Sequence, residues 1–167
     1  MFPRFPSTSR ALPGLALAGL LAVSPAPHAA AAAPALQLVG AGASETLDLS
    51  LDDLAKMQQT TVATETEFTD GKVAFTGPLV RDVLEKLGLD KLETVRFVAA
   101  NDYYVDIPTS DFTQFPVILA MEADGQPLTR RDKGPLWLMY PISDYPALKD
   151  PIYLRRLIWQ VVRIEAQ

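Results

Sequence analysis

Short apolar or alternating blocks separated by turn residues follow one another along the chain after residue 34. Several of these blocks are rich in β-branched and aromatic residues, which favour strands. The dipeptides Asp70-Gly71 and Asp124-Gly125 are typical of turns, and the first indicates a hairpin. The pattern predicts strands over residues 35–42 (a short strand and a small-residue turn), 46–49, 60–69, 72–75, 95–99, 103–107, 117–123, 136–140 and 157–164.

The segment 78–87 has the clearest helical periodicity. We expect Pro78 in its first turn and Gly88 as the cap of its C-terminal end. A shorter helix is predicted to begin with Ser50 as N-cap and to end at Met57. The apolar residues of the first helix share one face: Leu79, Val80, Val83, Leu84 and Leu87.

Strands outnumber helices in this pattern and do not alternate with them regularly. We therefore predict an α+β fold with mixed β-sheets and a few short helices. No internal repeat, heptad pattern or long charge block divides the sequence. Residues 34–167, about 134 in number, are enough for a single domain with its own core.

Residues 1–33 have the pattern of a secretory signal peptide. Arg4 and Arg10 give a positive start without acidic residues, residues 11–23 form a short apolar run, and a stretch of alanines follows. A membrane anchor is the alternative, but a span needs about 20 apolar residues, and this run is shorter and contains Pro13. We expect export, cleavage and a periplasmic protein without a membrane span.

The composition restricts the chemistry of the domain. The sequence contains no cysteine, and its single histidine, His28, lies in the leader. The domain therefore lacks a thiolate nucleophile, a Ser–His–Asp triad, a Cys/His zinc site and disulfides. Two of the 15 Lys and Arg residues lie in the leader, which leaves 13 against 20 Asp and Glu. Such an acidic domain is a poor nucleic-acid binder, so we expect no nucleic-acid partner.

Five segments of the domain together resemble a known family. Each is a pattern of apolar residues around a turn: 75–84 (FTGPLVRDVL), 95–110 (VRFVAANDYYVDIPTS), 118–128 (ILAMEADGQPL), 134–141 (GPLWLMYP) and 157–165 (LIWQVVRIE). In their order and spacing they resemble the oxidoreductase molybdopterin-binding domain of the sulfite oxidase family. The resemblance covers roughly residues 45–165. It implies a sulfite-oxidase-like fold and, for the family, a molybdopterin-dependent oxidoreductase.

The chain departs from this family at the metal. The resemblance places a molybdenum-ligating cysteine upstream of the Thr-Gly turn, in the window that is 62–68 (VATETEF) here. Thr64 and Glu65 are the nearest candidates, and neither supplies the soft sulfur ligand. Trp137 stands where many members carry an arginine, and no histidine is available for the cofactor phosphate. We therefore expect no resident cofactor, and molybdopterin is the alternative that the resemblance implies.

Three charged residues are the candidates for binding a ligand. Asp102 lies in a turn between two strands, where its carboxylate could accept backbone N–H groups or contact a ligand at a pocket mouth. Arg130 and Arg131 lie in a basic loop, which is either solvated or an anion-binding pair. We predict that Asp102, Arg130 and Arg131 line what remains of the cofactor cleft, with no catalytic residue and no metal ligand.

Other segments leave alternatives open. Arg155 and Arg156 form a second basic pair, of which only one could face a shared site if both lie in a strand. The loop at 143–152 could form a lid or a partner-binding edge. The acidic residues of 62–70 lack the spacing of a Ca²⁺ loop. The aromatic residues of the last third are expected in the core: Trp137, Tyr140, Tyr145, Tyr153 and Trp159.

These observations favour an exported module that binds a small anionic ligand or a periplasmic protein partner, without molybdenum catalysis. The main alternative is a molybdopterin-dependent oxidoreductase in which water or Glu65 completes the metal coordination. A structural subunit of a membrane-associated complex is the third hypothesis.

Overall fold

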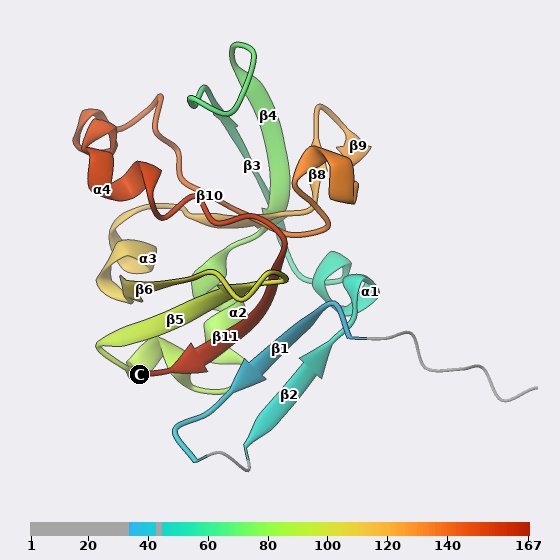
Figure 1. Cartoon of the computed structure of the whole chain (residues 1–167), viewed down its shortest axis with the longest axis vertical. Helices are drawn as coiled ribbons and strands as arrows, with labels where there is room; N and C mark the ends of the chain where they lie inside the picture. The colour runs from blue at the N-terminus through green and yellow to red at the C-terminus, as the bar shows by residue number, and fades with distance from the viewer. Residues whose placement is uncertain (1–33, 43–44) are drawn as a thin grey trace, which may run out of the picture. The chain divides into compact units, whose positions relative to one another are not determined.

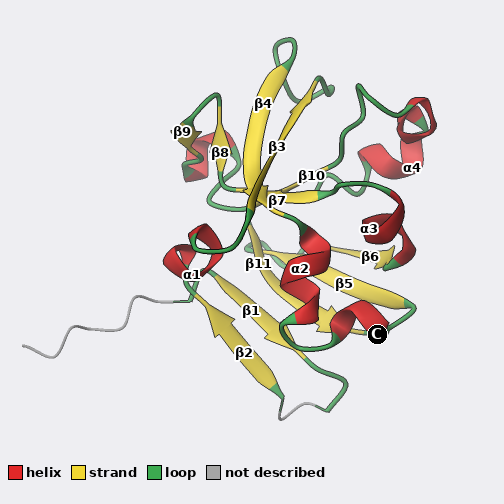
Figure 2. Cartoon of the chain, turned by 180° about the vertical axis from the view of Figure 1, so that it is seen from behind, coloured by secondary structure: helices red, strands yellow, loops and turns green. Residues whose placement is uncertain are grey.

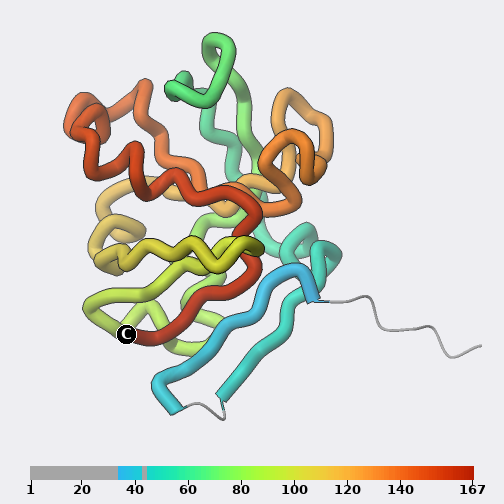
Figure 3. Tube along the Cα trace, viewed as in Figure 1, coloured from blue at the N-terminus to red at the C-terminus, as the bar shows by residue number. Residues whose placement is uncertain are grey.

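The computed structural model describes residues 34–42 and 45–167, and the predicted signal peptide of residues 1–33 lies outside them. A five-stranded sheet has the order β2-β1-β11-β5-β6. β1 and β11 are parallel and the other neighbours are antiparallel, so the sheet is mixed. Figure 3 shows the blue N-terminal strand beside the red C-terminal strand. The strands are β1 (Leu36–Val39), β2 (Thr46–Leu49), β5 (Thr94–Ala99), β6 (Tyr104–Pro108) and β11 (Val161–Ala166).

A second sheet is antiparallel, with the order β3-β4-β8-β9. A two-stranded ladder of β7 and β10 lies between the two sheets (Figure 2). β3 and β4 form the hairpin predicted around Asp70-Gly71 (Figure 1). The strands of these two sheets are β3 (Gln59–Thr64), β4 (Val73–Pro78), β7 (Ile118–Ala120), β8 (Glu122–Ala123), β9 (Gln126–Pro127) and β10 (Trp137–Met139).

The helices are short, and together with the mixed sheets they confirm the predicted α+β class. Figure 2 shows α2 covering the face of the five-stranded sheet that is turned toward the viewer in that figure. Among the described residues, none of the helices has the length and apolar character needed to cross a membrane. The helices are α1 (Leu51–Ala55), α2 (Val80–Glu85), α3 (Ser110–Gln114) and α4 (Pro151–Leu154), with 3₁₀ turns η1 (Leu89–Lys91), η2 (Arg130–Asp132) and η3 (Pro146–Lys149).

The predicted N-cap explains where α1 begins, whereas the C-cap of α2 is Lys86, two residues before the predicted cap Gly88. Ser50 Oγ accepts the Asp53 N–H at 3.1 Å, and the Asp53 carboxylate accepts the Ser50 N–H at 3.0 Å. This reciprocal pair lowers the pKa of Asp53, mainly through the hydrogen bonds from Ser50. Gly88 follows α2 with a φ of 68°, in the left-handed region that glycine adopts at low cost.

The core lies between the five-stranded sheet and α2. Alternate strand residues point toward the helix because side chains alternate between the faces of a strand. The helix contributes Val80, Val83 and Leu84 to the same buried cluster. The buried residues of the sheet include Leu36, Leu38, Val95, Phe97, Ile107 and Ile164.

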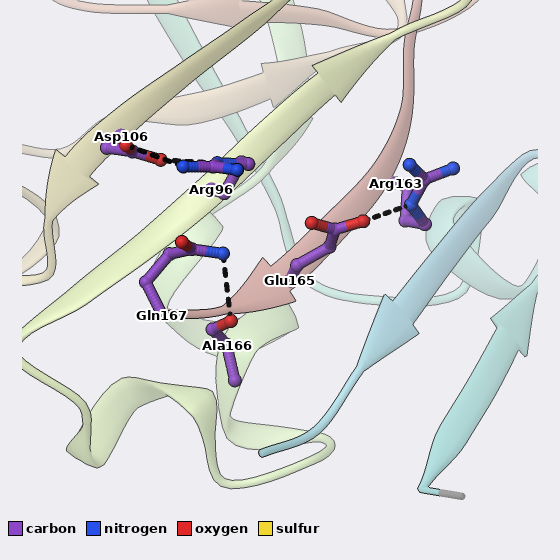
Figure 4. A network of polar contacts seen from close by, with 6 residues as sticks. All are labelled: Arg96, Asp106, Arg163, Glu165, Ala166 and Gln167. Atoms are coloured by element: carbon purple, nitrogen blue, oxygen red, sulfur yellow. Dashed lines mark hydrogen bonds and ion pairs between the residues drawn. The ribbon is translucent and has the colours of Figure 1, made fainter. Parts of the chain in front are cut away.

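The opposite face of this sheet is polar. Arg96 of β5 donates two hydrogen bonds to Asp106 of β6, at 2.7 and 2.9 Å, and Arg163 pairs with Glu165 along β11 (Figure 4). The hydrogen bonds from Arg96 lower the pKa of Asp106. These ion pairs are partly solvated, so they add little to stability and serve mainly to keep the face polar.

Two predicted boundaries are wrong because the chain changes its pairing partner. Pro78 is the last residue of β4 and not part of the helix, whose N-cap is Leu79. The predicted strand at 117–123 is two strands in different sheets, β7 and β8. Before Met121 the chain pairs with β10, and the Met121 N–H itself donates to the Thr76 carbonyl of β4 at 2.8 Å.

Two further predicted strands are too long. The segment 157–164 becomes a strand only at Val161, because Gln160 has a φ of 52° and donates its N–H to Lys133 O. The extended segment predicted at 60–69 ends at Thr64, because Thr66 and Thr69 close a turn through backbone and side-chain hydrogen bonds.

Candidate functional site

A cavity of about 350 Å³ opens where three segments that are distant in sequence meet. The β3–β4 connection contributes Glu67 and Phe68, and the turn between β5 and β6 contributes Asn101 and Tyr103. Ala99 and the stretch 154–159, apart from Arg156, complete the wall. The cavity is therefore formed by tertiary structure and not by any single motif.

The β5–β6 turn presents two of the lining residues. Asn101 Oδ1 accepts the Tyr103 N–H at 3.2 Å, and the Asp102 N–H donates to the Ala99 carbonyl at 3.0 Å. Asp102 has a φ of 64°. The Asx-type turn expected of Asp102 is thus made by Asn101, which can accept this hydrogen bond with its side-chain carbonyl. Asp102 lies between two cavity residues but does not line the cavity itself.

Two adjacent arginines at the end of α4 have different surroundings. Arg155 is the C-cap of α4 and lines the cavity, whereas Arg156 forms an ion pair with Asp111 of α3. Only one of the two faces the cavity, as predicted, but the reason is a helix end and not the alternation of a strand. Leu138 of β10 donates its N–H to Ile158 O at 2.9 Å and so attaches this stretch to the central ladder.

Aromatic rings form part of the cavity wall. Phe68 and Trp159 meet edge to face, with centroids 5.3 Å apart. Trp159 is 38% exposed, so the prediction that it lies in the core is wrong. Trp137 is buried in the core as predicted, where its Nε1 donates to Leu157 O at 3.3 Å. Trp137 does not line the cavity.

A buried ionic cluster holds the cavity wall in place. Asp111 accepts hydrogen bonds from Arg156 and, at 2.8 Å, from the Tyr140 hydroxyl. The side chains of Asp111 and Arg156 are only 8% and 11% exposed. The Arg156 guanidinium also lies 5.1 Å from the centre of the Tyr153 ring. Because a buried charge is stable only when paired, this cluster fixes where the chain emerges from α4.

Tyr140 makes the stability of this cluster depend on pH. Burial, with the charge of Asp111 and the hydrogen bond to it, raises the pKa of the Tyr140 hydroxyl well above its usual value. A tyrosine in the unfolded chain ionises near pH 10, roughly. The folded protein keeps its proton there, so this contribution to stability is present at lower pH and is lost as the pH rises.

We therefore expect the free energy of unfolding to fall more steeply from about pH 9 to about pH 11 in the natural protein than in Tyr140→Phe. Urea titrations at both pH values measure the difference. A parallel fall in the two proteins would show that Tyr140 does not set this dependence.

The three predicted ligand residues are not brought into the cavity. Arg130 and Arg131 are exposed in η2, which is fixed by a hydrogen bond from Gln160 Nε2 to Arg130 O at 3.0 Å. Neither they nor Asp102 line the cavity. That these residues contact a ligand stays a prediction. The arginine that does line the cavity, Arg155, had a signal in the sequence as part of the second basic pair.

The window predicted to replace the metal-ligating cysteine is occupied by hydrogen bonds. The Thr64 side chain is buried, and its Oγ1 accepts the Ser143 N–H at 3.1 Å. Ser143 Oγ in turn accepts the Glu65 N–H at 2.9 Å. Within residues 34–42 and 45–167, no group of three or more His, Cys, Asp or Glu could hold a metal ion. The donor set here does not fit a molybdenum centre held by protein sulfur.

A solved structure shares this fold. The sulfane dehydrogenase SoxCD from Paracoccus pantotrophus superposes with a TM-score of 0.57 at 16% identity, over 78% of this chain and 37% of that one. The chain thus spans well under half of that protein's length. This similarity confirms the predicted sulfite-oxidase-like fold. No protein of curated function matches the sequence.

A family model matches most of the sequence. It is described as the oxidoreductase molybdopterin binding domain, and it matches residues 24–145. The match begins inside the predicted leader and stops before the segment 157–165, which also carried the resemblance. Of the matched segments 75–84, 95–110, 118–128 and 134–141, only 95–110 contributes residues to the cavity wall. The chain belongs to the oxidoreductase molybdopterin-binding domain family.

Proposed function

We propose that this chain is an exported, periplasmic binding module of its family and does not carry out molybdenum chemistry. The proposal depends on one observation above all. In the window where the resemblance expects a thiolate, Thr64 is buried and hydrogen-bonded to Ser143. The sequence contains no cysteine that could take its place.

The proposed ligand site is the cavity lined by Trp159. Its size lies at the lower end of the range for small-molecule sites, which are mostly apolar with a few placed polar groups. Five of its ten lining residues lie in the stretch 154–159, beyond the family match at 24–145.

Metal content of the protein from its natural host tests the proposal. The protein is purified from the periplasm, and its molybdenum is measured by mass spectrometry and its pterin by fluorescence after oxidation. A cysteine-containing member of the family, produced in the same cells, is the positive control. We expect far less than one molybdenum per chain, and recovery in the periplasmic fraction. Stoichiometric molybdenum with pterin would overturn the proposal.

Family membership favours a second candidate, a molybdopterin-dependent oxidoreductase that holds its cofactor without a protein thiolate. The same metal analysis separates the two candidates, because only this one requires molybdenum to remain with the purified protein.

A further inference from the structure

Arg155 is exposed at the cavity wall and forms no ion pair with a described residue. Within residues 34–42 and 45–167, its guanidinium has no ion pair or hydrogen bond to another side chain. The domain is acidic, so a carboxylate partner would be easy to provide. Four other arginines each have one: Arg81, Arg96, Arg156 and Arg163. A planar guanidinium left open at a cavity suits an anion, above all a carboxylate that can accept two hydrogen bonds.

Three aromatic residues from three segments meet at the same cavity. Tyr103 is 52% exposed and Trp159 is 38% exposed, and Phe68 supports Trp159 from the side. Exposed aromatic surface that gathers in a concave site marks a place where an apolar body can be buried. An aromatic ring of a ligand bound here would be removed from water and could also stack on, or pack edge to face against, these side chains.

Glu67 limits how much negative charge the ligand can carry. Its exposed carboxylate lines the cavity and has no hydrogen bond or ion pair to another side chain in the described part of the chain. It repels a ligand with several negative charges, and it can accept a hydrogen bond from a hydroxyl or amine. The Asn101 amide group offers a further donor at the same wall.

We propose that the cavity binds a small aromatic carboxylate with a single negative charge, which pairs with Arg155 while its ring packs against Trp159 and Phe68. This inference rests on the proposed function, since it assumes that the cavity is a ligand site. A hydroxyl or amine on the ring would donate to Glu67. The volume of about 350 Å³ suits one or two rings.

Calorimetry and tryptophan fluorescence test this with para-hydroxyphenylacetate as the probe. Three matched compounds accompany it: the neutral amide of the same acid, hexanoate without a ring, and phenyl phosphate with a higher charge. We expect saturable binding of the probe, and binding about tenfold weaker or more for each of the three. Equal affinity for the neutral amide would overturn the role of the charge. Preference for phenyl phosphate would overturn the single-charge class.

The chain's two tryptophans allow the site to be located. Trp159 lines the cavity, whereas Trp137, its β-bridge partner, is buried outside it, so ligand binding should quench mainly Trp159. In Trp159→Phe most of the quenching should disappear while calorimetry still detects binding. Quenching of undiminished size in this variant would place the ligand elsewhere.

Arginine variants separate the two basic regions. Arg155→Gln should weaken binding of the probe about tenfold or more, whereas Arg81→Gln on α2 should leave it unchanged. Loss of binding in Arg131→Gln, with Arg155→Gln unaffected, would move the site to η2.

If no compound binds and the protein also lacks molybdenum, this ligand class is wrong and the proposed function stands. Molybdenum in the native protein would instead overturn the proposed function.

Discussion

Gly77→Ala is expected to destabilise the protein by about 3 kcal/mol or more, which is a large part of the stability of a domain this size. A Cβ at this position would lie 2.0 Å from the Leu119 carbonyl oxygen and 2.7 Å from its carbon. The two strands cannot separate to make room. On either side of Gly77, the Val80 N–H donates to Val117 O at 2.9 Å, and the Met121 N–H donates to Thr76 O.

Urea unfolding followed by circular dichroism measures this effect. Gly42→Ala is the matched control, because a Cβ there meets no atom within 4 Å. The control should unfold at the same urea concentration as the natural protein or slightly higher, since alanine restricts the unfolded chain. Equal midpoints for Gly77→Ala and the control would mean that β4 and β7 do not approach as closely as described.

Asp111→Ala is expected to cost about 3–5 kcal/mol of stability, because it leaves the buried Arg156 without its counter-charge. It also removes the acceptor for the Tyr140 hydroxyl. The stretch that ends α4 should loosen first, since Arg156 is its attachment to α3. Urea unfolding gives the loss, and hydrogen exchange shows whether the amides of 154–159 lose their protection.

A second aspartate–arginine pair in the same protein serves as the control. Asp106 and Arg96 also form a hydrogen-bonded ion pair, but their side chains are 42% and 28% exposed. Asp106→Ala should therefore change the unfolding midpoint only slightly. If both variants lost the same stability, burial would not explain the importance of the Asp111 pair.

The apolar spacing of the sequence predicts most of the core. Leu36 and Leu38 alternate as strand residues do, and Val80, Val83 and Leu84 recur at helical spacing, and all five are buried. These patterns are local, so each segment carries its own signal. Two of the errors fall at Met121 and Gln160, where the chain changes its pairing partner or turns. These two boundaries are determined by contacts with distant segments, which no local pattern contains.

The sequence does not predict the cavity, for a related reason. Phe68, Asn101 and Trp159 are far apart in the sequence, and no single motif contains more than one of them. Trp159 stands in an apolar segment typical of the core, and only the turn at Gln160 leaves it at the surface. The basic pair at Arg155 and Arg156 and the turn at Asn101 were visible signals. Their meeting at one cavity depends on how α4 packs.

The position of β11 in the sheet has a consequence for how the chain acquires its structure. It comes last in chain order among the described strands, yet it lies between β1 and β5. While its residues are still within the ribosome, β1 and β5 each have one unpaired edge, and the two halves of the sheet have no strand to join them. The five-stranded sheet cannot complete its native hydrogen bonding until β11 is available to pair with both β1 and β5.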